Sequence, residues 1–441
     1  MNKRNRPERR RLSAGTVFML ILLAAVLGGS ALVLGRLSSG ASVDQSKLNM
    51  SVLNIREASS QDPDRNTDED KTDGEEQPAA AASEKPTSAT EAPVAPGAEK
   101  AFMLTIGGSI SLSGEVRKNS RSTDAKVADY ADVMMLLAPQ IQSDVNAVFL
   151  ENILSDRHKA GDSTAPAQAS VLLKEAGFNM AAGGFSQSYV NGKDGIEATL
   201  MTLDSQGITS LGIRYADDPG TPEIRTVKGV KTAFLQYTST VPAKTRKAMA
   251  KEGTSGMVPE AELSLISRDI ETAREQGAEA VIVLVSWGKT GKDPDKAQRE
   301  LSAGIAAAGA DLIVGNGSHT PQTAEYLAGA NGRSVLCVWS LGTLLSGDRA
   351  NVRRMSGYLL HVTVRTDGQG GALVLNPEYT PVYTWKYKQD GRFYYRCIAA
   401  DGAAPDGMDS EQRKTMGKAA EAVESALKDA PLSRRGHADA P

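Results

Sequence analysis

The stretch "DPDKAQRELSAGIAAAGADLIVGNGSHTPQ", residues 293–322, joins a helix-like segment to an apolar run and ends in a glycine-rich polar turn. Asp293 can cap a helix and Pro294 suits its first position, so we predict a helix over 294–308. The run "DLIVG" (311–315) is apolar without alternation, which is typical of a strand buried on both faces of a parallel sheet. A helix followed by such a strand indicates an α/β fold.

The same alternation of helical segments and apolar runs occurs throughout the chain after residue 100. Further strands are predicted at 102–106, 146–150, 179–183, 231–237, 280–286 and 335–339, and further helices at 128–142, 166–176, 195–206 and 259–276. Two later strands, 357–366 and 372–385, have no helix between them and should be antiparallel, and 409–430 has the pattern of an amphipathic helix. The expected fold is a mostly parallel sheet with added antiparallel strands and with helices outside.

Charge and cysteine content exclude several classes of protein. The chain has 441 residues and a formal net charge of −3, which argues against nucleic-acid binding because such proteins carry a basic excess. Two cysteines, Cys337 and Cys397, are too few for a disulfide framework or for a cysteine-built zinc site. Cys337 lies in an apolar run and should be buried, although a single bridge between the two stays open if the domain faces an oxidising space.

The N-terminus has the features of a membrane anchor. Residues 1–11 are strongly basic, and no charged residue occurs from Leu12 to Gly35. At ~1.5 Å per residue, this length crosses a hydrocarbon core of ~30 Å, and the basic flank should stay in the cytoplasm. We predict an uncleaved signal-anchor helix over 12–36 that spans the cell membrane once and contacts its lipid, with all later residues extracellular. A cleaved signal peptide is the alternative.

A change of composition separates this anchor from the folded part of the chain. Residues 37–100 contain few large apolar side chains and many Asp, Glu, Ala, Pro and Ser residues, so they cannot bury enough surface to offset chain entropy. We therefore expect a disordered acidic linker there, a folded domain over 101–390, and a C-terminal extension with one amphipathic helix over 391–441.

Polar residues follow most of the predicted strands. Ligands of parallel α/β sheets bind beyond the carboxyl ends of the strands, so we expect one ligand-binding cleft there. Its predicted lining is Glu151, Asn152, Ser186, Gln187, Ser286, Trp287, Asn316, His319 and Thr343. Trp287 either lines a groove or covers the sheet, and the sequence leaves both interpretations open.

Five motifs in order give the chain a resemblance to a known family. They are "SDVNAVFLEN" (143–152), "AGFNMAAGGFSQSYVNGKDGIEATLMTLDSQGI" (176–208), "AVIVLVSWGKT" (280–290), "AGADLIVGNGSHTPQ" (308–322) and "VWSLGTLL" (338–345). Over about residues 102–385 the chain resembles the CapA family, bacterial proteins of capsule and poly-γ-glutamate synthesis. The resemblance implies a calcineurin-like metallophosphatase sandwich.

At the reactive positions of that family the sequence carries other residue types. They are Gly108 for an aspartate, Ser186 and Gln187 for asparagine and histidine, Ser286 and Gly317 for histidines, Thr290 for an acid and Thr343 for an asparagine. Glu151 and His319 remain as candidate metal ligands, fewer than the three protein ligands usual for one catalytic zinc. We therefore expect no cofactor and no divalent-metal pair, and His319 should instead hydrogen-bond within the cleft.

These observations leave three hypotheses about function. The first is a non-catalytic extracellular CapA-like protein that binds an anionic capsule polymer, such as poly-γ-glutamate, or another envelope glycan and assists its synthesis or export. The second is an active extracellular metallophosphoesterase with an unrecognised ligand set. The third is a scaffold that recruits membrane synthase subunits through its linker and C-terminal helix. The altered reactive positions favour a protein that is not an enzyme.

Overall fold

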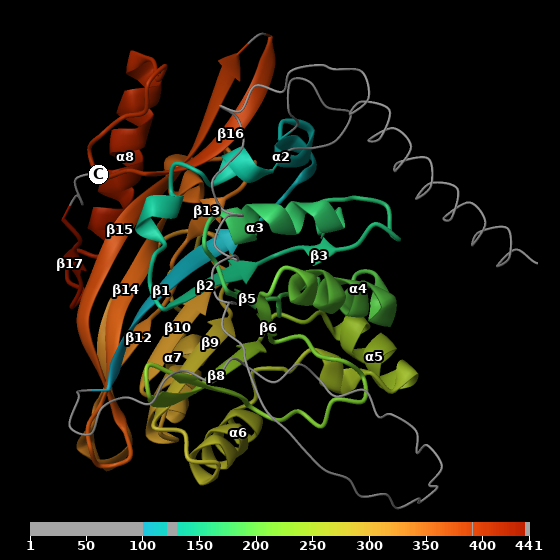
Figure 1. Cartoon of the computed structure of the whole chain (residues 1–441), viewed down its shortest axis with the longest axis vertical. Helices are drawn as coiled ribbons and strands as arrows, with labels where there is room; N and C mark the ends of the chain where they lie inside the picture. The colour runs from blue at the N-terminus through green and yellow to red at the C-terminus, as the bar shows by residue number, and fades with distance from the viewer. Residues whose placement is uncertain (1–99, 121–129, 390, 437–441) are drawn as a thin grey trace, which may run out of the picture. The chain divides into compact units, whose positions relative to one another are not determined.

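The computed structural model describes residues 100–120, 130–389 and 391–436 (Figure 1). The predicted cytoplasmic segment, anchor helix and linker up to residue 99 lie outside these described residues. Among the helices that are described, none is both long and apolar enough to span a membrane.

The first sheet contains parallel strands at one side and antiparallel strands at the other. Its order is β16 (Arg392–Ala399), β15 (Ala372–Gln389), β14 (Ser356–Thr366), β1 (Ala101–Ile110), β2 (Val145–Leu150), β5 (Met180–Ala182) and β6 (Thr209–Leu211). The strands from β1 to β6 pair in parallel, whereas β14, β15 and β16 pair antiparallel. Two short strands lie off this path and pair with inner strands, β13 (Thr343–Leu345) with β1 and β17 (Ser433–Arg434) with β15.

The second sheet is parallel in its centre. Its order is β11 (Ala324–Ala328), β12 (Ser334–Val338), β10 (Leu312–Asn316), β9 (Ala280–Ser286), β8 (Val230–Thr238) and β7 (Glu223–Val227). Only the two outermost strands, β7 and β11, pair antiparallel with their neighbours. A separate pair is formed by β3 (Ile153–Leu154) and β4 (Thr164–Ala165).

The two sheets share one apolar interior. Phe102 and Ile106 of β1 belong to the same buried cluster as Phe234 of β8, Leu284 of β9 and Val314 of β10. Because successive residues of a strand point to opposite faces, the remaining apolar side chains of each sheet face outward and need a cover. The result is the sandwich, with parallel strands and antiparallel additions, that the sequence predicts.

Helices supply that cover on the outer faces (Figure 1). They are α2 (Gly114–Lys118), α3 (Val171–Glu175), α4 (Gly192–Ser205), α5 (Ala243–Glu252), α6 (Leu263–Glu275), α7 (Lys296–Ala307) and α8 (Ser410–Ala426). Side chains of α6 and α7 pack on the second sheet, whereas α3 packs on the first.

Two local predictions about helices are wrong. The helix expected over 128–142 is replaced, within the described part of that range, by the 3-10 turns η2 (Ala131–Val133) and η3 (Ala138–Gln140). Pro139, which has no backbone N–H to donate, lies in the second of them. The cap of α7 is Asp295, not Asp293, and the Asp295 carboxylate accepts from Gln298 N at 3.1 Å in a reciprocal capping box.

The C-terminal extension is part of the same sheet. β16 continues the first sheet past residue 391, so the predicted boundary falls within the β15–β16 hairpin. α8 then packs against β15, with Met416 in one buried cluster with Tyr383 and Trp385. Cys337 and Cys397 are both buried and free, in different sheets, and form no bridge.

Candidate functional site

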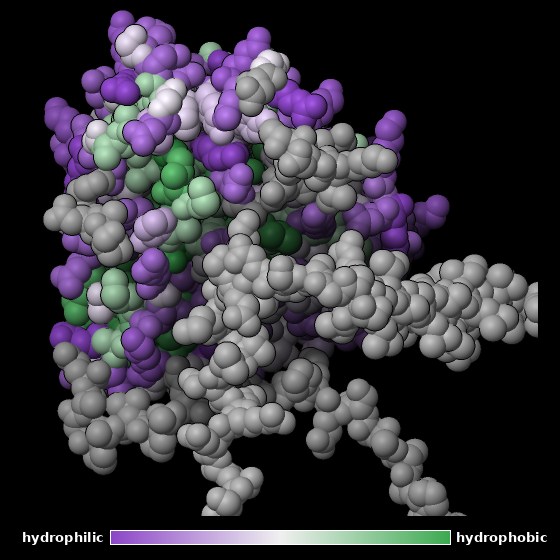
Figure 2. Space-filling view, turned by 45° about the horizontal axis from the view of Figure 1, so that its top comes forward, coloured by the Kyte–Doolittle hydropathy of each residue, from purple (hydrophilic) through white to green (hydrophobic). Residues whose placement is uncertain are grey.

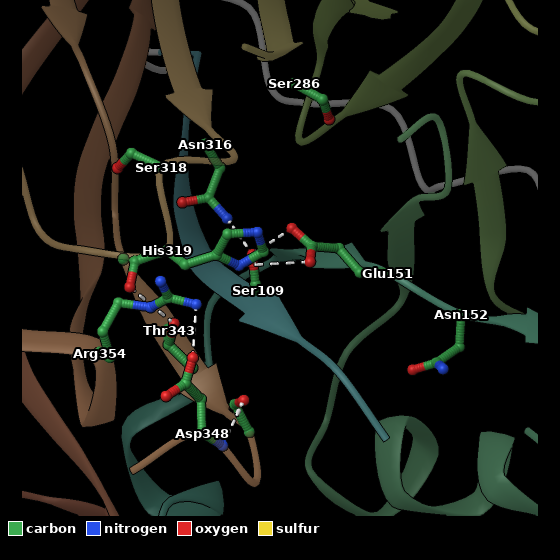
Figure 3. Close-up of polar contacts among 12 residues, drawn as sticks. Ser109, Glu151, Asn152, Ser286, Asn316, Ser318, His319, Thr343, Asp348 and Arg354 are labelled. Carbon is green, nitrogen blue, oxygen red and sulfur yellow. Dashed lines mark hydrogen bonds and ion pairs between the residues drawn. The ribbon is translucent and has the colours of Figure 1, made fainter. Parts of the chain in front are cut away.

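Three side chains join the two sheets at the carboxyl ends of their strands. Ser109 lies near the end of β1, Glu151 directly follows β2, and Asn316 is the last residue of β10. The Ser109 hydroxyl donates to Glu151 Oε1 at 2.6 Å, and Asn316 Nδ2 donates to Ser109 Oγ at 2.6 Å (Figure 3). This chain of hydrogen bonds links residues 207 positions apart, so tertiary packing alone brings them together.

His319 enters the same cluster from a strained turn. Its φ of +55° lies in the left-handed region, which is uncommon for a residue with a side chain. The turn places His319 Nδ1 3.4 Å from Glu151 Oε2, with 29% of the His319 and 15% of the Glu151 side chain exposed. Thr343 Oγ1 donates to the His319 carbonyl at 3.2 Å and holds the turn. Backbone strain of this kind is stored at functional sites.

A second layer of hydrogen bonds fixes the Asn316 amide, which is fully buried. Ser340 Oγ donates to Asn316 Oδ1 at 3.1 Å, and Ser318 Oγ donates to Ser340 Oγ at 3.0 Å. Because the amide oxygen is engaged with Ser340, the amide NH₂ group faces Ser109. The orientation of the bridge between the sheets is therefore set by residues that do not themselves touch Glu151.

Ser286 is buried, and its hydroxyl bonds to the backbone of another loop. Its hydroxyl donates to the Gly184 carbonyl at 2.6 Å, and Gln236 Nε2 donates to the same carbonyl at 2.8 Å. Gln236 Oε1 also accepts from Gly184 N at 2.9 Å. Figure 3 shows Ser286 apart from Glu151 and His319. Gln236 lies inside the apolar strand β8, and no sequence pattern marked it as a residue of the site.

Trp287 and Asn152 do not line the predicted cleft. Trp287 is 1% exposed, donates its indole N–H to the Trp339 carbonyl at 2.9 Å and stacks on the Trp339 ring with centroids 5.6 Å apart. It therefore covers the sheet. Asn152 is equally buried and accepts from Leu112 N at 2.7 Å, because alternation along the chain turns it away from Glu151.

Ser186 and Gln187 lie on the loop that follows β5. Ser186 is half-buried and Gln187 is exposed. The Gln187 amide oxygen accepts a hydrogen bond from the Ser163 hydroxyl, in the segment just before β4. This hydrogen bond ties Gln187 to the segment before β4.

The resemblance to the family predicts that Gly108 takes the place of a site aspartate. In the structure, Ser109 is the residue of β1 whose side chain reaches Glu151. A Cβ at residue 108 would lie 2.3 Å from the Gly342 carbonyl oxygen, so no side chain fits. Ser109 N donates to that same carbonyl at 2.9 Å, which leaves the Ser109 hydroxyl directed at Glu151. The signal available in the sequence was the position of Ser109 at the end of a predicted strand.

An ion pair was not anticipated at the rim of the site. Arg354 Nη2 lies 2.5 Å from Asp348 Oδ2, and Figure 3 shows the pair beside Thr343 and His319. Both residues belong to the segment between β13 and β14, where η7 (Val352–Met355) is capped by the Asn351 side chain. The rim thus offers a guanidinium close to the imidazole.

The donors of this site do not fit a pair of divalent cations. Within the described ranges, no three His, Cys, Asp or Glu side chains are grouped so that they could hold a metal ion. A dinuclear centre needs charged carboxylates and several imidazoles around both ions, whereas the partners of the Glu151 carboxylate here are the neutral Ser109 hydroxyl and one imidazole. One carboxylate and one imidazole are too few ligands for two ions.

Comparison with known proteins agrees with the sequence motifs. The chain is similar to "PGA biosynthesis protein CapA" of Bacillus subtilis (strain 168), with 27% identity over 202 residues, 45% of this chain and 50% of the relative. It is 25% identical over 198 residues to "Capsule biosynthesis protein CapA" of Bacillus anthracis, 44% of this chain and 46% of the relative. The matches thus span about half the length of these curated relatives.

A solved structure, the calcineurin-like phosphoesterase YfkN from Bacillus subtilis, aligns with 75% of this chain and 99% of its own, at 12% identity and a TM-score of 0.36. A likeness at this level says nothing about the chemistry of the site. The sequence model of the family "Bacterial capsule synthesis protein PGA_cap" matches residues 103–348, a range that contains Ser109, Glu151, Asn316 and His319. The chain belongs to the bacterial capsule synthesis protein PGA_cap family.

Proposed function

We propose that this protein is a membrane-anchored extracellular member of the family that assists the synthesis or export of an anionic capsule polymer, such as poly-γ-glutamate, by binding it without catalysis. The observation that carries the proposal is the chain of hydrogen bonds from Asn316 through Ser109 to Glu151. These groups are engaged with one another, so a two-metal hydrolytic mechanism has no ligand set. The names of the CapA relatives supply the class of polymer.

The groups left partly exposed in the cleft suit a chain of amides and carboxylates. Glu151 and His319 offer an acceptor and a ring nitrogen 3.4 Å apart, which together can take the N–H and the C=O of one amide. Arg354 at the rim is paired with Asp348 through Nη2, and its remaining N–H groups can donate to a carboxylate of the polymer. The placement outside the cell rests on the basic N-terminus and the uncharged run after it.

A binding experiment with the full-length chain tests this function. The protein, purified in a neutral detergent, would be assayed for retention of poly-γ-glutamate, for bound Mn, Fe and Zn, and for turnover of a phosphodiester. We expect retention without turnover, and weaker retention by His319→Gln, whose side chain keeps a similar size but loses the imidazole. Two bound metal ions per chain together with turnover would overturn the proposal in favour of a metallophosphoesterase. Retention unchanged by His319→Gln would instead favour a scaffold whose cleft is unused.

A further inference from the structure

We propose that the end of the β15–β16 hairpin is a second contact surface for the anionic polymer, through a face made by Lys386, Lys388 and Phe393, here called the hairpin face, which lies over the buried Tyr395. This inference rests on the proposed function and locates part of the binding. The hairpin face lies outside residues 103–348, so the family match assigns it no role.

The pairing of the hairpin places two ammonium groups over aromatic rings. Lys386 is opposite Tyr395 and Lys388 is opposite Phe393 in the antiparallel register. Lys386 Nζ lies 4.6 Å from the Phe393 ring centroid and 5.4 Å from that of Tyr395, and Lys388 Nζ lies 5.9 Å from the Phe393 centroid. Cation–π contacts of this kind hold a charge in place. Phe393 stays 45% exposed, so an apolar surface adjoins the charges.

The opposite face of the hairpin stiffens it. Trp385 and Tyr387 stack with ring centroids 4.2 Å apart, and Tyr387 stacks on Tyr394 at 5.4 Å. The Arg396 guanidinium lies over both tyrosines, at 5.8 Å and 5.9 Å from their centroids, and Trp385 is buried in one cluster with residues of α8. Because the hairpin is anchored in this way, the lysines of the other face need little ordering before they bind.

Charge and spacing indicate a polyanion as the partner. The segment "KYKQDGRFYYR" (386–396) carries four cations and one acid. Figure 2 brings this end of the molecule forward and shows it mostly hydrophilic, with apolar residues gathered below it. Alternate residues of a strand are about 7 Å apart, so the exposed Lys388 lies one repeat along from Lys386, which also contacts Glu115, and the two form a short row of charges. A flexible chain with a carboxylate on each unit and methylene groups between units matches such a row, with Phe393 contacting the methylenes.

The hairpin face adjoins α2 and the segment that carries the rim residues. Glu115 of α2, which follows β1 in the chain, accepts from Lys386 Nζ at 3.1 Å and from the Tyr395 hydroxyl at 3.0 Å, and Figure 1 shows α2 beside β16. Arg349, next in the chain to the rim residue Asp348, lies 5.2 Å over the Tyr395 ring and donates to the Thr384 carbonyl at 2.9 Å. A polymer held at the rim can therefore extend along the hairpin.

The test uses the full-length chain in nanodiscs of neutral lipid and fluorescent poly-γ-glutamate as the probe. The variant Lys388→Gln with Phe393→Ser changes two exposed side chains of the hairpin face, and Lys418→Gln, an exposed lysine of α8, is the matched control. We expect the hairpin variant to bind up to about fivefold more weakly and to show a shallower salt dependence, because it loses one exposed charge contact, which contributes modestly and is screened by salt. The control should bind as the wild type does, and unfolding temperatures should agree.

Three other results would separate this inference from the proposed function. Wild-type affinity in the hairpin variant, with binding lost in His319→Gln, would overturn the hairpin inference and leave the cleft as the binding site. No binding of poly-γ-glutamate by the wild type would overturn both. If the hairpin variant lost capture of phosphatidylglycerol vesicles and kept the polymer, the hairpin face would belong to an anionic membrane surface, and the inference would be wrong.

Discussion

Replacing Asn316 by alanine tests whether the bridge between the two sheets stabilises the fold. The change removes the N–H group donated to Ser109 Oγ at 2.6 Å and the oxygen that accepts from Ser340 at 3.1 Å. Each partner is buried, and a buried polar group left without its partner costs about 1–3 kcal/mol. Because Ser109 still donates to Glu151, we expect a total loss near the lower end, about 2–4 kcal/mol, or a fall in the unfolding temperature of about 4–8 °C.

Thermal and urea unfolding of the full-length protein would measure this loss, and Asn152→Ala provides the matched control. Asn152 is as buried as Asn316 and also makes two side-chain hydrogen bonds, to Leu112 N at 2.7 Å and to the Asp162 carbonyl at 3.2 Å. Both variants should lose stability, but only Asn316→Ala should weaken retention of poly-γ-glutamate. Wild-type stability in Asn316→Ala would refute the reasoning, since the bridge would then contribute no free energy between the sheets.

Three further changes have defined outcomes. Ser109→Asp would add a second carboxylate beside Glu151 and His319, so we expect it to bind Mn²⁺ in calorimetry while the wild type does not. Gly108→Ala should destabilise the protein by about 3 kcal/mol in urea unfolding, because its Cβ would lie 2.3 Å from the Gly342 carbonyl oxygen, whereas Gly161→Ala, with nothing within 4 Å, should change little. Burial, and then the charge of Arg435, lower the pKa of His361 from 6.5 to about 3. Below pH 6.5 the unfolded chain binds this proton and the folded chain does not. The free energy of unfolding should therefore fall by about 1.4 kcal/mol for each pH unit below 6.5. His361→Gln should show a smaller fall between pH 6.5 and 4.5.

The strands of the core could be predicted because burial on both faces leaves an unbroken apolar run. The run predicted at 280–286 has the same bounds as β9, in which every residue is buried. The edge strand β7 (Glu223–Val227) is partly exposed, and half of the residues of α5 (Ala243–Glu252) are charged, so neither carries such a signal and both were missed. Apolar runs also do not tell which strands pair, so the division into two sheets could not be predicted from them.

The candidate site could be predicted only as far as strand ends identify it. Glu151, Asn316 and His319 follow or end buried strands, and the carboxyl ends of parallel strands lie at one edge of a sheet. Which neighbouring side chain faces the cleft depends on alternation and on tertiary contacts. Asn152, next in the chain to Glu151, points the other way and bonds to Leu112 N. Ser109, and not Gly108, reaches the site because the Gly342 backbone leaves no room for a side chain at residue 108.

Ser109, Glu151 and Asn316 are consistent with one another as a set of hydrogen-bonding groups. Two carboxylates at the 2.6 Å that separates Ser109 Oγ from Glu151 Oε1 would repel and would need a cation between them. A hydroxyl in that place can donate to the carboxylate and accept from Asn316, so the two sheets are joined by hydrogen bonds that need no cation between them. Ser109→Asp should therefore both destabilise the metal-free protein and create affinity for a cation. Changing Ser109 and Asn316 together to alanine should remove the bridge with less penalty than the sum of the single changes, since neither would leave the other unpaired.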